Sequence, residues 1–259
     1  HGTTLIALLN PAESPAVQSA VMDTLSRYTH TDGADALLNR WQELSPAVRR
    51  QALTALLNRT TWTQRLLDSI EQQQISAAVL STADLNRLQQ HPQESIREAA
   101  ARLIVQSGTT PRQQTVDRYR PALAMAGDVS RGAEVFRKVC FTCHKVGNVG
   151  HEVGPNLLST RNRGNEFILL NVLDPNREVL PAWHDYIAVL NDGRTATGIV
   201  AQESPVSVTL RRAEAKESKI LRSDIEVLRD TGQSLMPADL EKTVSIQQMA
   251  DLLAWLQAQ

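Results

Sequence analysis

This chain has few cysteines, no long apolar run and no excess of one charge. Each of these absences excludes a class of protein or of binding partner. The 259 residues carry 27 basic and 28 acidic side chains, a net charge of −1. This balance gives no electrostatic basis for binding nucleic acid or an anionic membrane. No apolar run approaches the roughly 20 residues that a membrane-spanning helix needs. Residues 1–4 have no basic segment leading into a long apolar stretch, so no secretory signal is visible.

The only two cysteines lie in one motif, Cys140-Phe141-Thr142-Cys143-His144, of the form C-x-x-C-H. This is the attachment signature of a c-type haem, in which each thiol adds to one vinyl group and the histidine becomes the proximal iron ligand. A redox dithiol would not need the histidine and usually follows a strand, whereas the segment before Cys140 has a helical pattern. A zinc site would need further ligands, and no second cysteine pair exists. The motif predicts one covalent haem c with His144 as a metal ligand.

Covalent haem attachment takes place outside the cytoplasm, so we expect a periplasmic or otherwise exported protein. The chain would then be a mature protein or, more in keeping with its start, a C-terminal piece of a longer exported one. Its length favours two domains, and an apolar fraction of 42% is ample for their cores.

The first part of the chain, residues 1–107, has the pattern of stacked helix pairs. The sequence Ser-Pro-Ala-Val at residues 14–17 recurs at residues 45–48, 31 residues later, and a looser third copy begins at Glu94. In each Ser-Pro pair the serine suits a helix N-cap and the proline suits the first helical position. The pattern resembles HEAT-type α-solenoid repeats, in which each unit buries its apolar stripe against its neighbours. An ordinary helical bundle is the alternative.

Proline and glycine punctuate residues 108–126, which we expect to be a linker with room for one short helix. Residues 127–259 should form a second domain, interrupted at about 186–229 by a β insertion. Short segments there alternate apolar and polar residues, and Asp192-Gly193 is a hairpin turn signal. Such strands can close into a small SH3- or Sm-like barrel. The predicted fold class is mainly α with a small β insertion.

Two helices at the ends of the second domain should cross closely. Gly132 and Phe136 lie one turn apart on the helix that leads into the C-x-x-C-H motif, and Leu252 and Trp255 lie on a helix that opens with a capping box at Ser245. This arrangement closely resembles class I c-type cytochromes, which implies the class I cytochrome c fold for residues 127–259.

The resemblance implies the ligands of the iron. A Gly-Pro-Asn-Leu segment at residues 154–157 follows the motif, and in class I cytochromes such a proline carbonyl accepts the N–H of the proximal imidazole. Pro155 would then orient His144. The best candidate for the sixth ligand is Met236, a thioether followed by a stiffening proline. The rival sixth ligands are His151 and His184.

Other side chains near these motifs are candidate contacts of the haem. Arg161, like Arg163, could neutralise a haem propionate or be an exposed arginine on a loop. Apolar and polar neighbours that could line the pocket are Phe136, Asn156, Leu157 and Leu235. No residue is assigned a catalytic role.

A narrower resemblance is to the haem-binding C-terminal domain of large exported proteins of planctomycetes and verrucomicrobia. It covers residues 127–259 and rests on motifs at residues 132–144, 154–157, 173–181, 192–198 and 234–237. In that family the haem domain often follows helical repeats and a β-propeller that resembles soluble dehydrogenases. The propeller is absent from this chain.

These observations favour electron transfer over catalysis. A haem ligated by His144 and Met236 has no open site, and the resemblance implies a dehydrogenase as electron donor and a soluble redox protein as acceptor. The alternative is a haem with an open site, used to bind or sense peroxide or a gas. A third reading makes the repeats a protein-binding surface. The β insertion lacks the basic, aromatic surface of an RNA-binding barrel, so we expect it to act as a scaffold.

Overall fold

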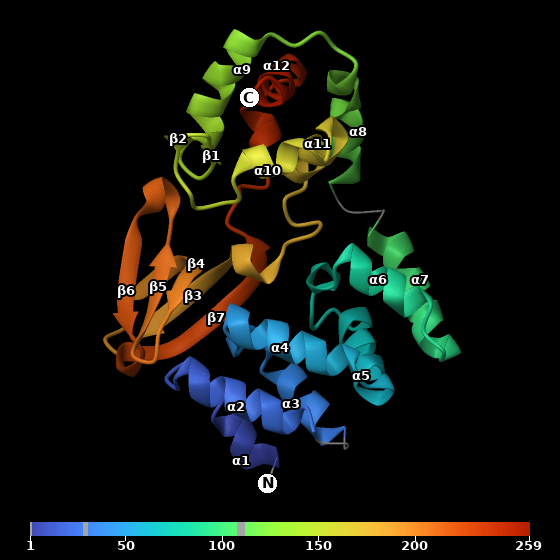
Figure 1. Cartoon of the computed structure of the whole chain (residues 1–259), viewed down its shortest axis with the longest axis vertical. Coiled ribbons are helices and arrows are strands. Elements are labelled where there is room, and N and C mark those ends of the chain that lie inside the picture. The colour runs from blue at the N-terminus through green and yellow to red at the C-terminus, as the bar shows by residue number, and fades with distance from the viewer. Residues whose placement is uncertain (1, 28–30, 108–111) are drawn as a thin grey trace. The chain divides into compact units, whose positions relative to one another are not determined.

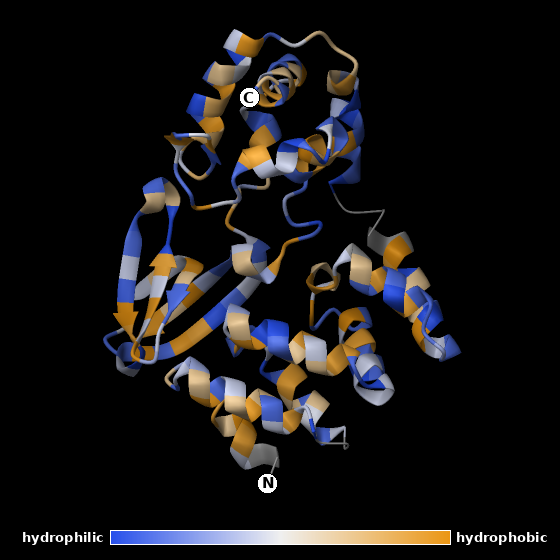
Figure 2. Cartoon of the chain, in the orientation of Figure 1, coloured by the Kyte–Doolittle hydropathy of each residue, from blue (hydrophilic) through white to orange (hydrophobic). Residues whose placement is uncertain are grey.

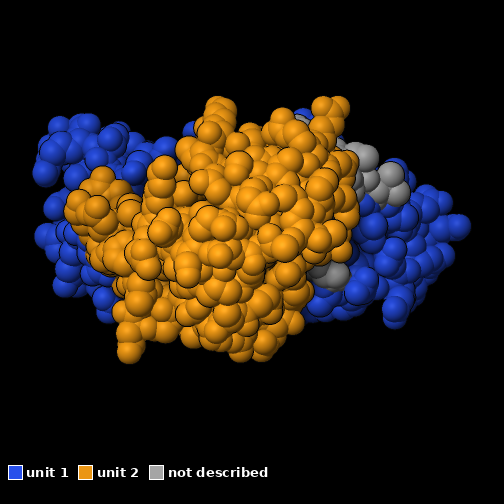
Figure 3. Space-filling view, turned by 90° about the horizontal axis from the view of Figure 1, so that it is seen from above, with its two compact units in different colours: residues 1–107, 178–210, 217–235 blue, residues 108–177, 211–216, 236–259 orange. Residues whose placement is uncertain are grey.

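The computed structural model describes residues 2–27, 31–107 and 112–259 (Figure 1). The chain divides into two compact units, coloured separately in Figure 3. Unit 1 consists of His1–Ser107, Glu178–Leu210 and Glu217–Leu235, and unit 2 of Gly108–Arg177, Arg211–Lys216 and Met236–Gln259.

The N-terminal part of unit 1 is helical, as the repeated pattern predicts. Its helices are α1 (Gly2–Ala7), α2 (Pro15–Leu25), α3 (Asp32–Asn39), α4 (Pro46–Leu57), α5 (Thr60–Glu71), α6 (Thr82–Gln89) and α7 (Glu94–Ser107), with short 3₁₀ turns η1 (Trp41–Glu43) and η2 (Ala77–Val79). Both Ser-Pro pairs begin helices: the Ser14 hydroxyl accepts the Val17 N–H at 3.3 Å and the Ser45 hydroxyl accepts the Val48 N–H at 3.5 Å. Helix α2 packs on α4, α4 on α5, and α5 on α7. Hydropathy is mixed along these helices, as in an amphipathic array (Figure 2).

The remainder of unit 1 is a five-stranded sheet. Its strands are β3 (His184–Leu190), β4 (Thr195–Glu203), β5 (Ser207–Arg211), β6 (Glu217–Leu221) and β7 (Ile225–Ser234), in the order β6-β5-β4-β3-β7. The predicted hairpin is present: Val189 pairs with Thr195, and Gly193 adopts a φ of +82° in the turn. A separate apolar cluster lies on this sheet and includes Tyr186, Ala188, Val208 and Leu210.

A buried polar cluster joins the helices of unit 1 to this sheet. The side chain of Arg49 on α4 is 1% exposed and forms an ion pair with Asp230 on β7, whose carboxylate also contacts the His184 ring on β3 at 2.6 Å. The Arg49 guanidinium donates to the carbonyl of Trp41 at 2.6 Å, and the Tyr186 hydroxyl donates to the carbonyl of Leu44 at 3.2 Å. Removing any one partner would leave another buried without its counterpart.

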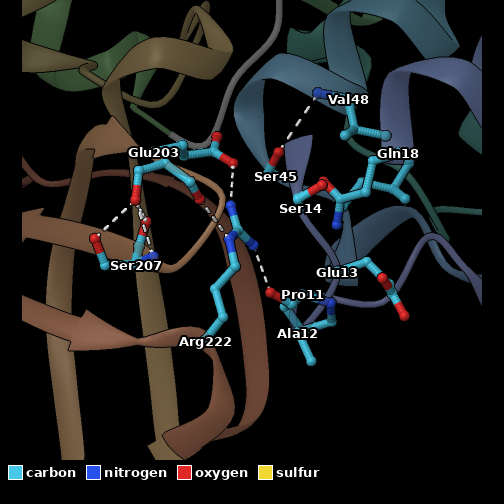
Figure 4. Close-up of polar contacts among 12 residues, drawn as sticks. Pro11, Ala12, Glu13, Ser14, Gln18, Ser45, Val48, Glu203, Ser207 and Arg222 are labelled. Carbon is cyan, nitrogen blue, oxygen red and sulfur yellow. Dashed lines mark hydrogen bonds and ion pairs between the residues drawn. The ribbon is translucent and has the colours of Figure 1, made fainter. Parts of the chain in front are cut away.

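A second polar connection lies between the sheet and the loop before α2 (Figure 4). The buried Arg222 guanidinium donates to the carbonyls of Pro11 and Ser204 and forms an ion pair with Glu203 at 3.0 Å. The strands therefore group with residues 1–107, whereas the sequence led us to expect them as an insertion within residues 127–259. Periodicity identifies a strand, but it does not identify the surface that a sheet will cover.

Unit 2 contains the helices α8 (Gln113–Tyr119), α9 (Val129–Val135), α10 (Leu157–Arg161), α11 (Asn165–Leu173) and α12 (Ile246–Gln257), and a small hairpin of β1 (Lys145–Val146) and β2 (Val149–Gly150). Among the described residues, no helix is long and apolar enough to span a membrane.

The predicted close crossing is that of α9 and α12. A Cβ atom on Gly132 would lie 2.6 Å from the Cβ of Trp255 and would clash with the carbonyl oxygen of Asp251. Phe136, which is fully buried, packs on Trp255 with 4.6 Å between ring centroids. Leu252 is buried in the same cluster as Phe136 and Trp255. Asp251 also lies at the crossing, and its carboxylate accepts hydrogen bonds from Arg131 at 2.8 and 2.9 Å. The capping box at Ser245 is present.

The segment expected to be a linker is part of the core of unit 2 over its described residues. Residues 108–111 lie outside the described part, but α8 and the 3₁₀ turn η3 (Arg120–Leu123) bury Val116, Tyr119 and Ala122 in the same cluster as Phe136. The Tyr119 hydroxyl donates to the carbonyl of Val244 at 2.6 Å. Proline and glycine mark the ends of this helix in the sequence, but they do not indicate whether the helix packs against a core.

Candidate functional site

The C-x-x-C-H motif begins where α9 changes its helical pitch. Residues Phe136–Cys140 form a π-helical turn, η4, in which the Phe141 N–H bonds the Phe136 carbonyl at 2.9 Å. The His144 N–H then bonds the Cys140 carbonyl at 2.8 Å, which holds both thiols and the imidazole on successive turns. Single π-helical turns are frequent at functional sites because they re-aim the side chains that follow. The helix predicted to lead into the motif is therefore present, with a changed pitch at its end.

The His144 ring is held from two sides. Its Nδ1 lies 2.9 Å from the carbonyl oxygen of Pro155, which has no proton to give, so Nδ1–H donates and Nε2 keeps the lone pair. On its other side, a Cβ atom placed on Gly154 would lie 2.5 Å from Cε1 of the ring. The contact with Pro155 is the one that the class I resemblance implies, and it leaves Nε2 as the atom able to bind a metal.

The backbone around this loop is closely cross-linked. The N–H groups of Val153 and Gly154 both bond the carbonyl of Cys143, at 3.0 and 2.7 Å. Burial lowers the pKa of His144, while the hydrogen bond to Pro155 acts in the opposite direction. The net lowering favours the neutral imidazole, which is the form that coordinates iron.

Cys140 and Cys143 form no disulfide with each other, and both are half-buried. Burial, and secondly the neighbouring Cys143, raise the pKa of Cys140 to about 12, so this sulfur stays a thiol near neutral pH. A redox dithiol needs a stabilised thiolate, which this environment disfavours. Within the described ranges, no group of three or more His, Cys, Asp or Glu side chains could hold a metal ion. The donor set fits thioether attachment with a single imidazole ligand better than a zinc site.

Apolar side chains surround the motif on its inner side. Phe136 belongs to the buried cluster of unit 2, and Cys140, Phe141 and Leu157 pack against that cluster. Asn156 caps α10, its side-chain oxygen accepting the Leu158 N–H at 3.0 Å. Phe136 and Leu157 therefore share one apolar cluster with Cys140, and Asn156 begins the helix that follows Pro155.

Other predicted residues lie in varied surroundings. The Arg161 guanidinium donates to the backbone oxygen of Gln259, and the Arg163 guanidinium lies 3.7 Å from the centroid of the Phe167 ring. Met236 is half-buried in the bend after β7 and belongs to unit 2, as His144 does. Leu235, one residue earlier, belongs to unit 1.

The two rival ligands have other surroundings. His184 is 2% exposed in unit 1, where both ring nitrogens have partners, Asp230 and the carbonyl of Val179 at 3.1 Å. The His151 ring packs edge-on against Phe141, with 5.2 Å between centroids.

Two features near the motif escaped the sequence analysis. The contact of Gly154 with the His144 ring depends on a turn whose path the sequence does not show. Residues 211–216, between β5 and β6, group with unit 2, and the Glu214 N–H donates to the carbonyl of Thr142 at 2.7 Å. No local sequence pattern predicts this contact.

Comparison with known families identifies one match. Residues 127–194 match the family described as cytochrome C oxidase, cbb3-type, subunit III. The matched segment includes α9, the C-x-x-C-H motif and Pro155, and supports a cytochrome c-type domain with its haem cofactor and electron-transfer role. A search of curated proteins found no match.

Proposed function

We propose that unit 2 carries a single haem c, bound through thioether bonds to Cys140 and Cys143 and ligated by Nε2 of His144. The observation that carries this proposal is the orientation of His144, whose Nδ1–H is committed to Pro155 at 2.9 Å, directly beside two unpaired thiols. A histidine in an ordinary turn does not need its ring to be held on both sides in this way. Here Gly154 leaves room for the ring on one side and Pro155 fixes its rotation on the other.

We further propose that Met236 is the sixth ligand. Its support is its place in unit 2, in a half-buried bend that ends at Pro237, and the softness of the thioether donor. Phe136, Leu157 and Phe141 would exclude water from the haem, which favours a stable potential over ligand exchange. Arg161 and Leu235 remain candidate haem contacts of lower rank.

When bound, such a haem supplies one-electron transfer between Fe(III) and Fe(II). The residues around it keep the imidazole neutral and aligned, and the chain would pass electrons from a dehydrogenase-like donor to a soluble redox protein. Residues 127–259 would belong to the exported planctomycete and verrucomicrobial type, with the class I fold, and residues 1–107 to the HEAT-like repeats. The protein would then be an electron-transfer part of a larger exported protein and would not itself be an enzyme.

The test is an absorption spectrum of protein matured with a cytochrome c assembly system, oxidised and reduced, beside Met236→Ala. A low-spin spectrum with a weak sulfur-to-iron charge-transfer band, lost in the variant, is the expected result. A high-spin spectrum with rapid CO binding would contradict electron transfer and favour a haem with an open site that binds or senses peroxide or a gas. A low-spin spectrum unchanged in the variant would move the sixth ligand to a histidine. His151→Ala is the matched control, because that ring contacts the motif without being the proposed ligand.

A further inference from the structure

The six residues Arg211–Lys216 connect β5 to β6, yet they group with the unit that contains the C-x-x-C-H motif. We call this segment the brace. The strands on either side of it, over residues 207–210 and 217–221, group with unit 1. A connection between neighbouring antiparallel strands needs only two residues, so neither the length nor the grouping of the brace follows from hairpin geometry.

Two hydrogen bonds tie the brace to the backbone on both sides of His144. The Glu214 N–H donates to the carbonyl of Thr142, between the two cysteines, at 2.7 Å. The Arg211 guanidinium donates to the carbonyl of Glu152 at 3.0 Å. Thr142 belongs to the turn that carries the thiols, and Glu152 lies two residues before Gly154, whose backbone backs the imidazole ring. Both bonds end on the main chain, so they fix loop position rather than neutralise a charge.

The brace keeps an unfavourable backbone conformation. Glu214 and Ala215 have φ values of +60° and +55°, in the left-handed region that non-glycine residues rarely occupy. Such strain persists only where the surroundings hold it, and it gathers at sites that depend on position. Within the brace, Lys216 forms an ion pair with Glu214 at 2.6 Å, and the Arg212 N–H bonds the Lys216 carbonyl at 2.9 Å. The ion pair is exposed and contributes little, whereas the backbone bond between Arg212 and Lys216 holds the tip in the conformation that presents the Glu214 N–H to Thr142.

We propose that the brace positions the haem-attachment turn, with Arg211 and the Glu214 backbone as positioning groups for His144. The proposal rests on the haem function proposed above. By fixing the carbonyls of Thr142 and Glu152, the brace limits the motion of the two loops that set the Nδ1–Pro155 hydrogen bond. A looser brace lets that bond vary in length, and because the bond raises the basicity of the imidazole, the reduction equilibrium of the iron changes with it.

The test compares four variants of the matured holoprotein with the wild type. In the first, Ala213-Glu214-Ala215 is replaced by Asn-Gly, which closes the hairpin with a two-residue turn and removes the donor to Thr142. The second, Arg211→Gln, removes the guanidinium, and Arg211→Lys should rescue it in part. The control is Glu214→Gly, which keeps the N–H and adopts a positive φ without strain.

The measurements are the reduction potential and the amide hydrogen exchange of residues 140–154. We expect the first two variants to change the reduction equilibrium constant threefold to tenfold, up to about 59 mV for one electron. Exchange in this segment should be at least tenfold faster, while the control matches the wild type. Wild-type potential and exchange in the Asn-Gly variant would overturn the proposal.

The outcome separates the brace from the haem function. A wild-type protein that matures without covalent haem would contradict the function proposed above, and exchange of the haem-free protein would still decide whether the brace holds the turn. Covalent haem in every variant, with unchanged potential and exchange, would support the haem function and contradict the positioning role of the brace.

Discussion

Gly154 is the residue whose substitution tests the geometry around His144 most sharply. In Gly154→Ala, the added Cβ would lie 2.5 Å from Cε1, 3.0 Å from Nδ1 and 3.1 Å from Nε2 of the His144 ring. Ordinary contact needs about 3.5 Å, so the ring must retreat by roughly 1 Å. Its Nδ1 now lies 2.9 Å from the Pro155 oxygen, and a shift of that size takes an N–H···O contact outside the usual range of about 2.7–3.2 Å.

The expected consequence is a higher reduction potential. With the proposed haem bound, the Nδ1–H bond would make the imidazole a stronger donor and so stabilise the oxidised iron. Such a bond contributes about 1 kcal/mol, and losing it entirely from the oxidised state would raise the potential by about 40 mV, given 59 mV and about 1.4 kcal/mol for each tenfold change. We expect a rise of about 20–40 mV, because part of the bond survives if the loop yields.

The assay is a potentiometric titration of the matured holoprotein. Gly147→Asn is the matched control: Gly147 lies in the β1–β2 turn with a φ of +58°, has no atom within 4 Å of an added Cβ, and asparagine tolerates that conformation. The control should keep the wild-type potential. A Gly154→Ala potential and spectrum equal to the wild type would refute the idea that this glycine sets the position of His144.

Three further predictions concern stability and use urea denaturation. Arg49→Met leaves the carboxylate of Asp230 buried without its cation and should cost about 3–5 kcal/mol. Adding Asp230→Asn should recover part of that loss, and a purely additive double variant would contradict the pairing. Gly132→Val forces α9 away from α12 and should cost at least about 1–3 kcal/mol; a wild-type midpoint would contradict the crossing. Hydrogen bonding to Arg131, chiefly, lowers the pKa of Asp251 to about 2. Its ionised form therefore stabilises the fold above pH 4, and this stabilisation disappears as the pH falls through 2. Relative to the wild type, Asp251→Asn should lose up to about 2 kcal/mol at pH 7, after allowance for the exposed arginine, and nothing near pH 2. A pH-independent difference would contradict the assignment.

Local chemistry made much of the fold readable from the sequence. Ser-Pro pairs, the capping box at Ser245 and the Asp-Gly turn are all short-range signals, and each begins or ends the element it predicts. The close crossing was also readable, because Gly132, one turn before Phe136, leaves room on its helix for a bulky side chain such as Trp255. The C-x-x-C-H motif and the proline carbonyl needed no long-range information beyond the spacing of residues 140–155.

Long-range contacts were not readable. The association of the sheet with residues 1–107 depends on Arg49, Asp230 and Arg222, and a charged residue in a sequence looks the same whether it is exposed or buried with a partner. The helix within residues 112–123 was expected, but its burial depends on Tyr119 reaching the carbonyl of Val244. The brace depends on the hydrogen bond between Glu214 and Thr142, which lie 72 positions apart in the sequence. It also depends on positive φ angles at Glu214 and Ala215, which neither glutamate nor alanine predicts.

The most direct test of the central claim is whether haem remains attached to the polypeptide after unfolding. Protein matured with a cytochrome c assembly system would be denatured, extracted with acidified organic solvent, and examined by intact mass and by its pyridine haemochrome spectrum, beside Cys140→Ala/Cys143→Ala. We predict that the wild type keeps one haem per chain through two thioether bonds and that the double variant releases all of its haem. A wild type whose mass equals that of the bare polypeptide would contradict the account.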